Sequence, residues 1–168
     1  MPQRILKQTG AEKRQTRLTD MTKTTTRAAF LVLVAGGGLL IGALTAPGAW
    51  YAGLEKPHFN PPNWIFGPVW TVLYILIAMA GWRAYEAGSQ RLRLWWTQLG
   101  LNFLWSPVFF VLQQPWLAAV IIAALFGVIV AFIAQSWPKD RLSAWGFVPY
   151  LAWVGFATVL NLSIAILN

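Results

Sequence analysis

Long stretches without any charged residue constrain this chain more than any other feature of its sequence. No Asp, Glu, Lys or Arg occurs in residues 28–54, 94–138 or 142–168. A helix needs roughly 20 consecutive apolar residues to cross a hydrocarbon core about 30 Å thick, and each of these stretches is longer than that. Because 57% of the 168 residues are hydrophobic and only 11% are charged, the composition disfavours a water-soluble fold.

Five windows of the sequence have the length and apolar character of membrane spans. Charge, proline or a polar turn bounds each window, and the windows cover residues 28–46, 64–82, 94–112, 115–134 and 144–167. A β-barrel would show alternating segments of about ten residues instead, and the sequence has no such pattern. It therefore predicts an all-α, polytopic membrane protein whose transmembrane domain, residues 28–168, is a bundle of five helices.

Residues 1–27 differ from the rest of the chain, because they are rich in Thr, Gln, Lys and Arg and carry few apolar side chains. Such a composition is typical of disordered segments, so we expect a disordered basic tail here. Either Met1 or Met21 is compatible with the start of the protein. The connection from Pro47 to Asn63 is the longest one, and its prolines predict a folded lid over the bundle.

The distribution of basic residues predicts the orientation in the membrane. With five spans, twelve of the thirteen Lys and Arg residues fall on the side of the amino terminus, and only Lys56 falls on the other side. Under the positive-inside rule the amino terminus is cytoplasmic, and we expect a bacterial cytoplasmic (inner) membrane. The net charge of +8 then reflects topology, and no nucleic-acid partner is predicted.

Aromatic and amide side chains recur at helical spacing within three of the windows. The stripes comprise Trp70 and Tyr74 in the second window, Trp95, Gln98, Asn102, Trp105 and Phe109 in the third, and Trp153, Ala157, Leu160, Asn161 and Ile164 in the fifth. One interpretation is a packed core in which Asn102 and Asn161 form hydrogen bonds across helices. The other is a cleft for a flat, largely apolar ligand that these amides orient. The stripes alone leave both open.

Small residues and prolines within the windows predict local adjustments of the helices. Gly38 and Gly42 form a small-xxx-small pair, which favours close helix approach inside the bundle or between protomers. Pro107 and Pro149 should each bend their helix. Trp82, Trp137 and Trp145 lie near the ends of windows, as anchoring residues at the membrane interface do.

Residues for metal binding or hydrolysis are scarce. The chain has one histidine, His58, no cysteine and five acidic residues, all of them outside the windows. No metal site and no catalytic residues of the nucleophile–base type are therefore predicted, and no cofactor is required.

Four segments resemble the tryptophan-rich sensory protein and translocator protein family (TspO/MBR). They are Trp50 to Pro57, Pro61 to Tyr74, Gln98 to Phe110 and Pro149 to Asn161, and the resemblance extends over about residues 30–168. It implies a five-helix bundle, often a homodimer in membrane lipid, with a pocket under the first loop that binds protoporphyrin IX or a related tetrapyrrole. The ligand-binding residues that it implies are Trp50, Tyr51, Trp64, Trp70, Asn102, Trp105, Trp116, Trp153, Ala157 and Leu160.

Three functions are compatible with this resemblance. The first is a porphyrin-binding sensor or regulator, which we expect. The second is a carrier that moves tetrapyrroles or other hydrophobic ligands across the membrane. The third is an enzyme that degrades porphyrin in light, for which the resemblance implies Trp70 and Trp153 as the participating residues.

Overall fold

The structure is a computed structural model that describes the backbone of residues 2–168 and the side chains of residue 12 and residues 14–168. Met1 and the other side chains near the amino terminus, among them those of Arg4, Lys7 and Lys13, lie outside this part.

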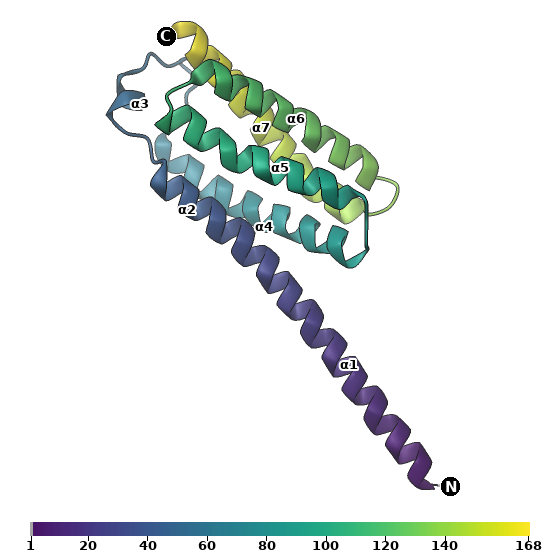
Figure 1. Ribbon diagram of the computed structural model, residues 1–168. Helices are drawn as coiled ribbons and strands as arrows, with labels where there is room; N and C mark the ends of the chain where they lie inside the picture. The colour runs from purple at the N-terminus through teal and green to yellow at the C-terminus, as the bar shows by residue number, and fades with distance from the viewer. Residues whose placement is uncertain (1) are drawn as a thin grey trace.

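Five long helical segments lie side by side in the described part of the chain (Figure 1). The elements are α1 (Pro2–Leu31), the π-helical η1 (Val32–Gly36), α2 (Gly37–Leu44), α3 (Ala49–Gly53), the 3₁₀ turn η2 (Asn63–Ile65), α4 (Phe66–Glu86), α5 (Arg91–Ser106), the π-helical η3 (Pro107–Val111), α6 (Pro115–Ser136) and α7 (Arg141–Leu167). The first segment consists of α1, η1 and α2, and it contacts α4. From α4 the contacts continue to α7, then to α6, then to α5, and α5 in turn contacts α2. The helices thus form a closed ring, and the predicted helical membrane bundle is confirmed.

Four helical stretches are long and apolar enough to cross a membrane: Arg14–Leu44, Asn63–Glu86, Pro115–Ser136 and Arg141–Leu167. They overlap the first, second, fourth and fifth predicted windows.

The third window corresponds to α5 and η3. Arg91 and Arg93 lie in the first turn of α5, and the helix changes to π-helical geometry at Pro107. Proline has no N–H to donate, and the wider turn is closed by a hydrogen bond from Leu112 N to Pro107 O at 2.9 Å. At Pro149, in contrast, α7 continues unbroken.

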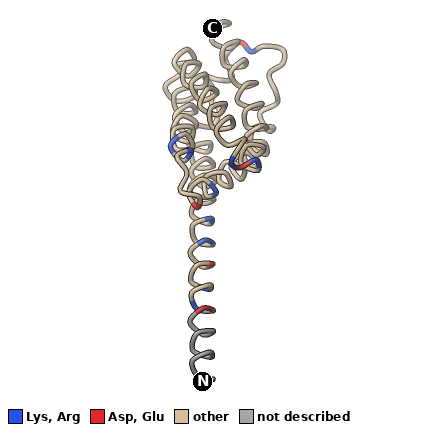
Figure 2. The backbone as a smooth tube through the Cα atoms, turned by 90° about the vertical axis from the view of Figure 1, so that its right-hand side faces the viewer, with Lys and Arg blue, Asp and Glu red and all other residues tan. Residues whose placement is uncertain are grey.

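The first helix begins much earlier than expected. A disordered tail was predicted for residues 1–27, whereas α1 continues back to Pro2 and projects well beyond the bundle (Figures 1 and 2). No proline or glycine interrupts residues 11–35, and several threonine hydroxyls bond to carbonyl groups four residues earlier, as Thr25 does to Met21 at 2.9 Å. Where α1 meets the bundle, Arg27 pairs with Glu86 of α4 at 3.0 Å.

The connection after α2 folds over the end of the bundle that lies opposite the projecting helix (Figure 1). Its short helix α3 buries Tyr51 against Phe109 and Phe110, at ring distances of 6.2 and 5.3 Å. The side chain of Asn168 bonds to both backbone groups of Glu55, each at 3.0 Å. These contacts hold the connection, hereafter the lid (residues 45–62), against the helices.

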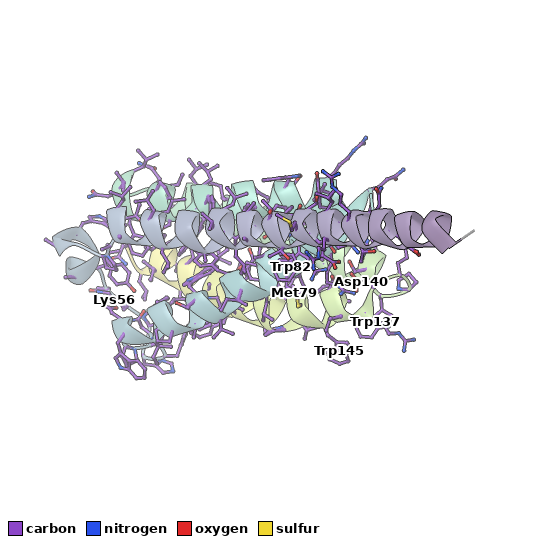
Figure 3. All side chains as sticks on the ribbon, turned by 90° about the horizontal axis from the view of Figure 1, so that it is seen from below. Lys56, Met79, Trp82, Trp137, Asp140 and Trp145 are labelled. Carbon is purple, nitrogen blue, oxygen red and sulfur yellow. The ribbon has the colours of Figure 1, made fainter. Side chains whose placement is uncertain are left out.

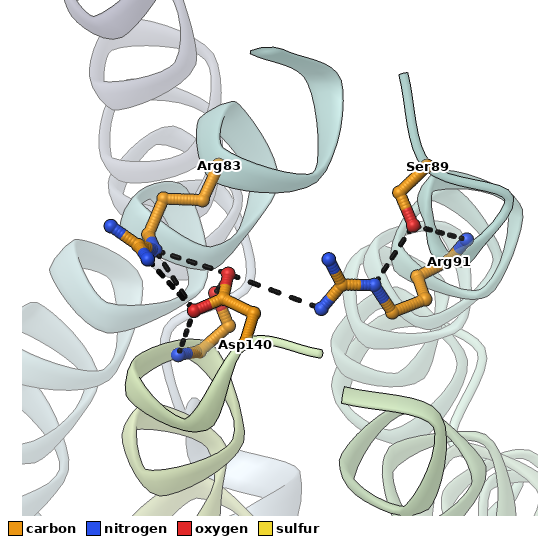
Figure 4. Close-up of polar contacts among 5 residues, drawn as sticks. Arg83, Ser89, Arg91 and Asp140 are labelled. Carbon is orange, nitrogen blue, oxygen red and sulfur yellow. Dashed lines mark hydrogen bonds and ion pairs between the residues drawn. The ribbon is translucent and has the colours of Figure 1, made fainter. Parts of the chain in front are cut away.

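A charged cluster joins the helices at the other end of the bundle, where Asp140 caps α7 (Figure 4). Arg83 donates from Nη2 and Nε to the Asp140 carboxylate, at 2.8 Å for the shortest bond, and Ser143 Oγ donates to it at 2.7 Å. Arg91 Nη1 lies 3.9 Å from the same carboxylate. Burial disfavours the ionised carboxylate, but the hydrogen bonds from Arg83 and Ser143 outweigh this effect and lower the pKa of Asp140 to about 2.

We expect Asp140→Asn to lower the free energy of unfolding by about 2 kcal/mol, because the partly exposed Arg83 and the buried Arg91 lose a charged acceptor. The pKa is lower in the folded state, so the stabilisation is complete above about pH 4 and is lost as the pH falls toward about 2. Unfolding in detergent at several pH values measures it. Glu55→Gln, which alters an exposed carboxylate, is the control and should change stability by less than about 0.5 kcal/mol. Equal stability of the parent and Asp140→Asn at pH 7 would contradict the expectation.

Candidate functional site

An apolar cavity of about 370 Å³ lies between α2, α4 and α5 at the lid end of the bundle. Residues from all three helices, η2, η3 and the lid line it: Gly38, Leu39, Ile41, Gly42, Ala43, Thr45, Pro47, Tyr51, Asn63, Phe66, Gly67, Trp70, Tyr74, Asn102, Phe103, Trp105, Ser106 and Phe110. Four of the predicted ligand-binding residues are thus brought together here, namely Tyr51, Trp70, Asn102 and Trp105.

Flat aromatic surfaces form much of the cavity wall. The rings of Trp70 and Tyr74, one turn apart on α4, stack at 5.2 Å. On α5 and η3, the rings of Trp105 and Phe109 stack at 5.5 Å with an angle of 27° between their planes. Aromatic faces offer a large apolar contact area with a defined orientation, so the cavity suits a planar, mainly hydrophobic molecule.

Hydrogen bonds across helices hold these aromatic walls in position. Trp105 Nε1 donates to Asn161 Oδ1 at 3.0 Å, and Asn161 Nδ2 donates to Pro115 O at 2.9 Å. Asn102 Nδ2 donates to the Tyr150 hydroxyl at 2.9 Å, which in turn donates to Gln98 Oε1 at 3.0 Å. The amides therefore bond across helices, as the packed-core interpretation predicted, while Asn102 and Trp105 also line the cavity.

Small residues and a hydroxyl group interrupt the α2 side of the cavity, which Leu39 and Ile41 also line. Gly38 is buried against the Tyr74 ring, and a Cβ at this position would lie 2.2 Å from Tyr74 Cζ. A Cβ at Gly42 would meet no atom within 4 Å, and Thr45 bonds to Ser106 of α5 through their hydroxyl groups. Gly38 thus permits the close approach predicted within the bundle. No ligand-binding role was predicted for Gly38, Gly42 and Thr45, although their spacings of four and three residues place them on one helical face.

Trp153 and Ala157 of α7 lie behind the walls of the cavity. They share a void of only about 10 Å³ with Trp70, Asn102 and Trp105, among others, so packed side chains fill this region. Trp153 Nε1 is buried and has no hydrogen-bond partner among the described residues. Leu160 is buried in a neighbouring hydrophobic cluster that includes Tyr51 and Phe109.

The remaining predicted residues lie outside both spaces. Trp50 packs edge-on against Phe109 at 5.8 Å. Trp64 is 73% exposed and Trp116 is 58% exposed, and neither lines the cavity or the small void. The structure therefore divides the ten predicted residues among a cavity, its packed support and the outer surface.

Comparisons with known proteins agree with this architecture. The family model described as the TspO/MBR family matches residues 29–167. The "Tryptophan-rich protein TspO" of Archaeoglobus fulgidus is 46% identical over 123 residues, which cover 71% of this chain and 80% of that protein. The "Tryptophan-rich sensory protein" of Cereibacter sphaeroides is 38% identical over 149 residues, 84% and 92% of the two chains. The human "Translocator protein" is 36% identical over 119 residues, 67% and 70%. This chain belongs to the TspO/MBR family.

Proposed function

We propose that this protein is a membrane-embedded sensor or regulator that binds a porphyrin, with protoporphyrin IX or a related tetrapyrrole as its ligand. The observation that carries the proposal is the cavity of about 370 Å³ with stacked aromatic walls, since pockets for small molecules typically span about 300–1,000 Å³. The name of the Cereibacter relative, a sensory protein, is consistent with this role.

The chemistry of the walls supports a macrocycle rather than a polar metabolite. No charged side chain is among the residues that line the apolar cavity. Trp70 and Trp105 line the cavity with indole rings that a flat ligand can contact, and the few polar groups, such as Asn102 and the Thr45–Ser106 pair, can orient it. Burial raises the pKa of the Tyr51 hydroxyl, which lines both the apolar cavity and the space under the lid.

The charge distribution supports an orientation for the protein. Charged residues gather on α1 and at the end of the bundle from which α1 emerges (Figure 2), whereas the lid end carries only Glu55 and Lys56. In the proposed arrangement the protein lies in a bacterial cytoplasmic membrane with its amino terminus in the cytoplasm. The lid and the cavity beneath it then face the opposite side.

Titration of the purified protein with protoporphyrin IX tests the proposal, because bound porphyrin should quench the emission of nearby tryptophans. We expect saturable quenching in the parent and about tenfold weaker binding in Trp70→Leu, since an aromatic stacking surface is lost. The matched control is Trp145→Leu, which removes an exposed indole outside the cavity and should leave the affinity unchanged. Absence of saturable quenching in the parent, or equal affinities of the two variants, would contradict the proposal.

A light-dependent porphyrin-degrading enzyme is the second candidate. It is favoured by one arrangement: Trp70 lies on the cavity wall and shares the small void behind it with Trp153. Comparison of porphyrin loss in light and in darkness, with and without the protein, separates this activity from binding alone.

A further inference from the structure

A second cavity, of about 430 Å³, lies within the lid and is bordered by the first residue of η2. Its lining residues are Pro47, Gly48, Tyr51, Ala52, Lys56, Asn60, Pro61, Pro62 and Asn63. Three of them, Pro47, Tyr51 and Asn63, also line the apolar cavity, so the two spaces adjoin. The chemistry differs between them, because the lid cavity has an ammonium group and two amides where the apolar cavity has aromatic rings.

The side chain of Lys56 is held in place at this cavity. Its Nζ donates to Leu54 O at 2.9 Å and to Ala52 O at 3.3 Å, and it lies 4.7 Å from the centre of the Tyr51 ring. An ammonium group has three N–H donors, so these two bonds leave one donor without an acceptor among the described residues. The fold therefore fixes the position of the charge and leaves one donor available for a ligand.

Lys56 lies far from every charged residue except Glu55, its neighbour in the sequence. It is the only basic residue between Arg27 and Arg83 in the sequence, and it lies at the opposite end of the bundle from Asp140 (Figure 3). The ion pairs of the described side chains involve Arg27, Arg83 and Arg91, and none of them includes Lys56 or its neighbour Glu55. A positive charge without an acidic partner thus borders a cavity that continues into an apolar one.

We propose that the lid cavity is a carboxylate-binding subsite, and that the two adjoining cavities together select flat amphiphiles with an anionic group at one edge. Lys56 forms the ion pair with the carboxylate. Asn63 lines the same cavity and can add a neutral hydrogen bond, whereas the Asn60 amide is bonded to the Tyr51 hydroxyl and to Pro61 O. The apolar body of the ligand then occupies the space between α2, α4 and α5. This inference rests on the proposed function, which places the body of a porphyrin in that space.

A comparison of protoporphyrin IX, a dicarboxylic acid, with its uncharged dimethyl ester tests the subsite. We expect the parent to bind the acid about tenfold more tightly than the ester, because charge-assisted hydrogen bonds are stronger than neutral ones. In Lys56→Gln the affinity for the acid should fall about tenfold, whereas the affinity for the ester should change less than twofold. Added salt should weaken only the binding of the acid to the parent.

Lys56→Arg serves as the conservative control, since it keeps the charge and should retain the preference for the acid. Equal affinities of the parent for acid and ester would overturn the subsite while leaving the proposed function intact. Equal losses for acid and ester in Lys56→Gln would also overturn it, because Lys56 would then only support the lid. Absence of saturable binding of both compounds to the parent would overturn the subsite and the proposed function together.

Discussion

Gly42→Leu is expected to weaken the binding of protoporphyrin IX at least tenfold while leaving the protein as stable as the parent. Gly42 lines the apolar cavity, and nothing lies within 4 Å of a Cβ built at this position. The Cβ of a leucine therefore meets no protein atom, and we expect the rest of the side chain to occupy volume that the ligand needs. The substitution should even favour the helix, because leucine is a better helix former than glycine by up to about 1 kcal/mol.

The matched control for this experiment is Gly127→Leu in α6. Its Cβ also meets no atom within 4 Å, and Gly127 lines neither the apolar cavity nor the lid cavity. Affinities from quenching titrations and unfolding midpoints should be measured for both variants in the same detergent. If Gly42→Leu bound porphyrin as tightly as Gly127→Leu, the cavity between α2, α4 and α5 would not be the binding site.

The helical bundle could be predicted because charge-free windows of sufficient length have few structural solutions in a membrane. Each predicted window overlaps one long helical segment, and the helices extend beyond most windows, as α4 does to Glu86. The amino-terminal segment shows the limit of this reasoning. Composition predicted disorder for residues 1–27, whereas α1 begins at Pro2. A helix that has already begun in the membrane needs no apolar face of its own to continue, and no proline occurs between Pro2 and Pro47, although Gly10 lies within the helix.

The candidate site could be predicted only in part, and the reason lies in what a helical stripe reveals. Periodicity identifies which side of a helix faces protein, so Asn102 and Trp105 were recognised correctly as inward-facing residues. It does not reveal whether the facing helix fills the intervening space. Opposite Trp105 and Asn102, α7 packs tightly through Ala157, whereas α2 presents Gly42 and leaves a cavity. Whether a space remains beside α5 therefore depends on how α2 and α7 pack against it. Both helices are distant from α5 in sequence, so the periodicity of α5 alone does not reveal the cavity.

The lid illustrates a second limit. Prolines predicted a folded connection, but not the contacts that create the lid cavity, such as the hydrogen bond from the Tyr51 hydroxyl to Asn60 Oδ1 at 3.1 Å. Lys56 was prominent in the sequence as the one basic residue on its side of the membrane. Only the folded lid brings its ammonium group to the lid cavity, which shares three lining residues with the apolar cavity.

The largest loss of stability is expected from Gly81→Ala. At this position Trp95 of α5 packs so closely against the backbone of α4 that no space remains for a Cβ atom. A Cβ at Gly81 would lie 2.4 Å from Trp95 Cε2 and 2.8 Å from Phe30 Cδ1. Trp95 cannot move away easily: it is completely buried, it donates from Nε1 to Ile77 O at 2.8 Å, and its ring packs against Phe30 at 5.0 Å. We expect a loss of about 3 kcal/mol, at the upper end of overpacking costs.

Unfolding of Gly81→Ala in detergent should be compared with that of Gly100→Ala in α5, where a Cβ meets nothing within 4 Å. The control should be neutral or slightly stabilised, because alanine favours a helix over glycine. A smaller ring in Trp95→Phe should relieve the collision, so the double variant Gly81→Ala/Trp95→Phe should lose less than the sum of the two single losses. Equal stabilities of Gly81→Ala and Gly100→Ala would show that the junction of α1, α4 and α5 can yield, and that the close contact of Trp95 with Gly81 does not hold these three helices in register.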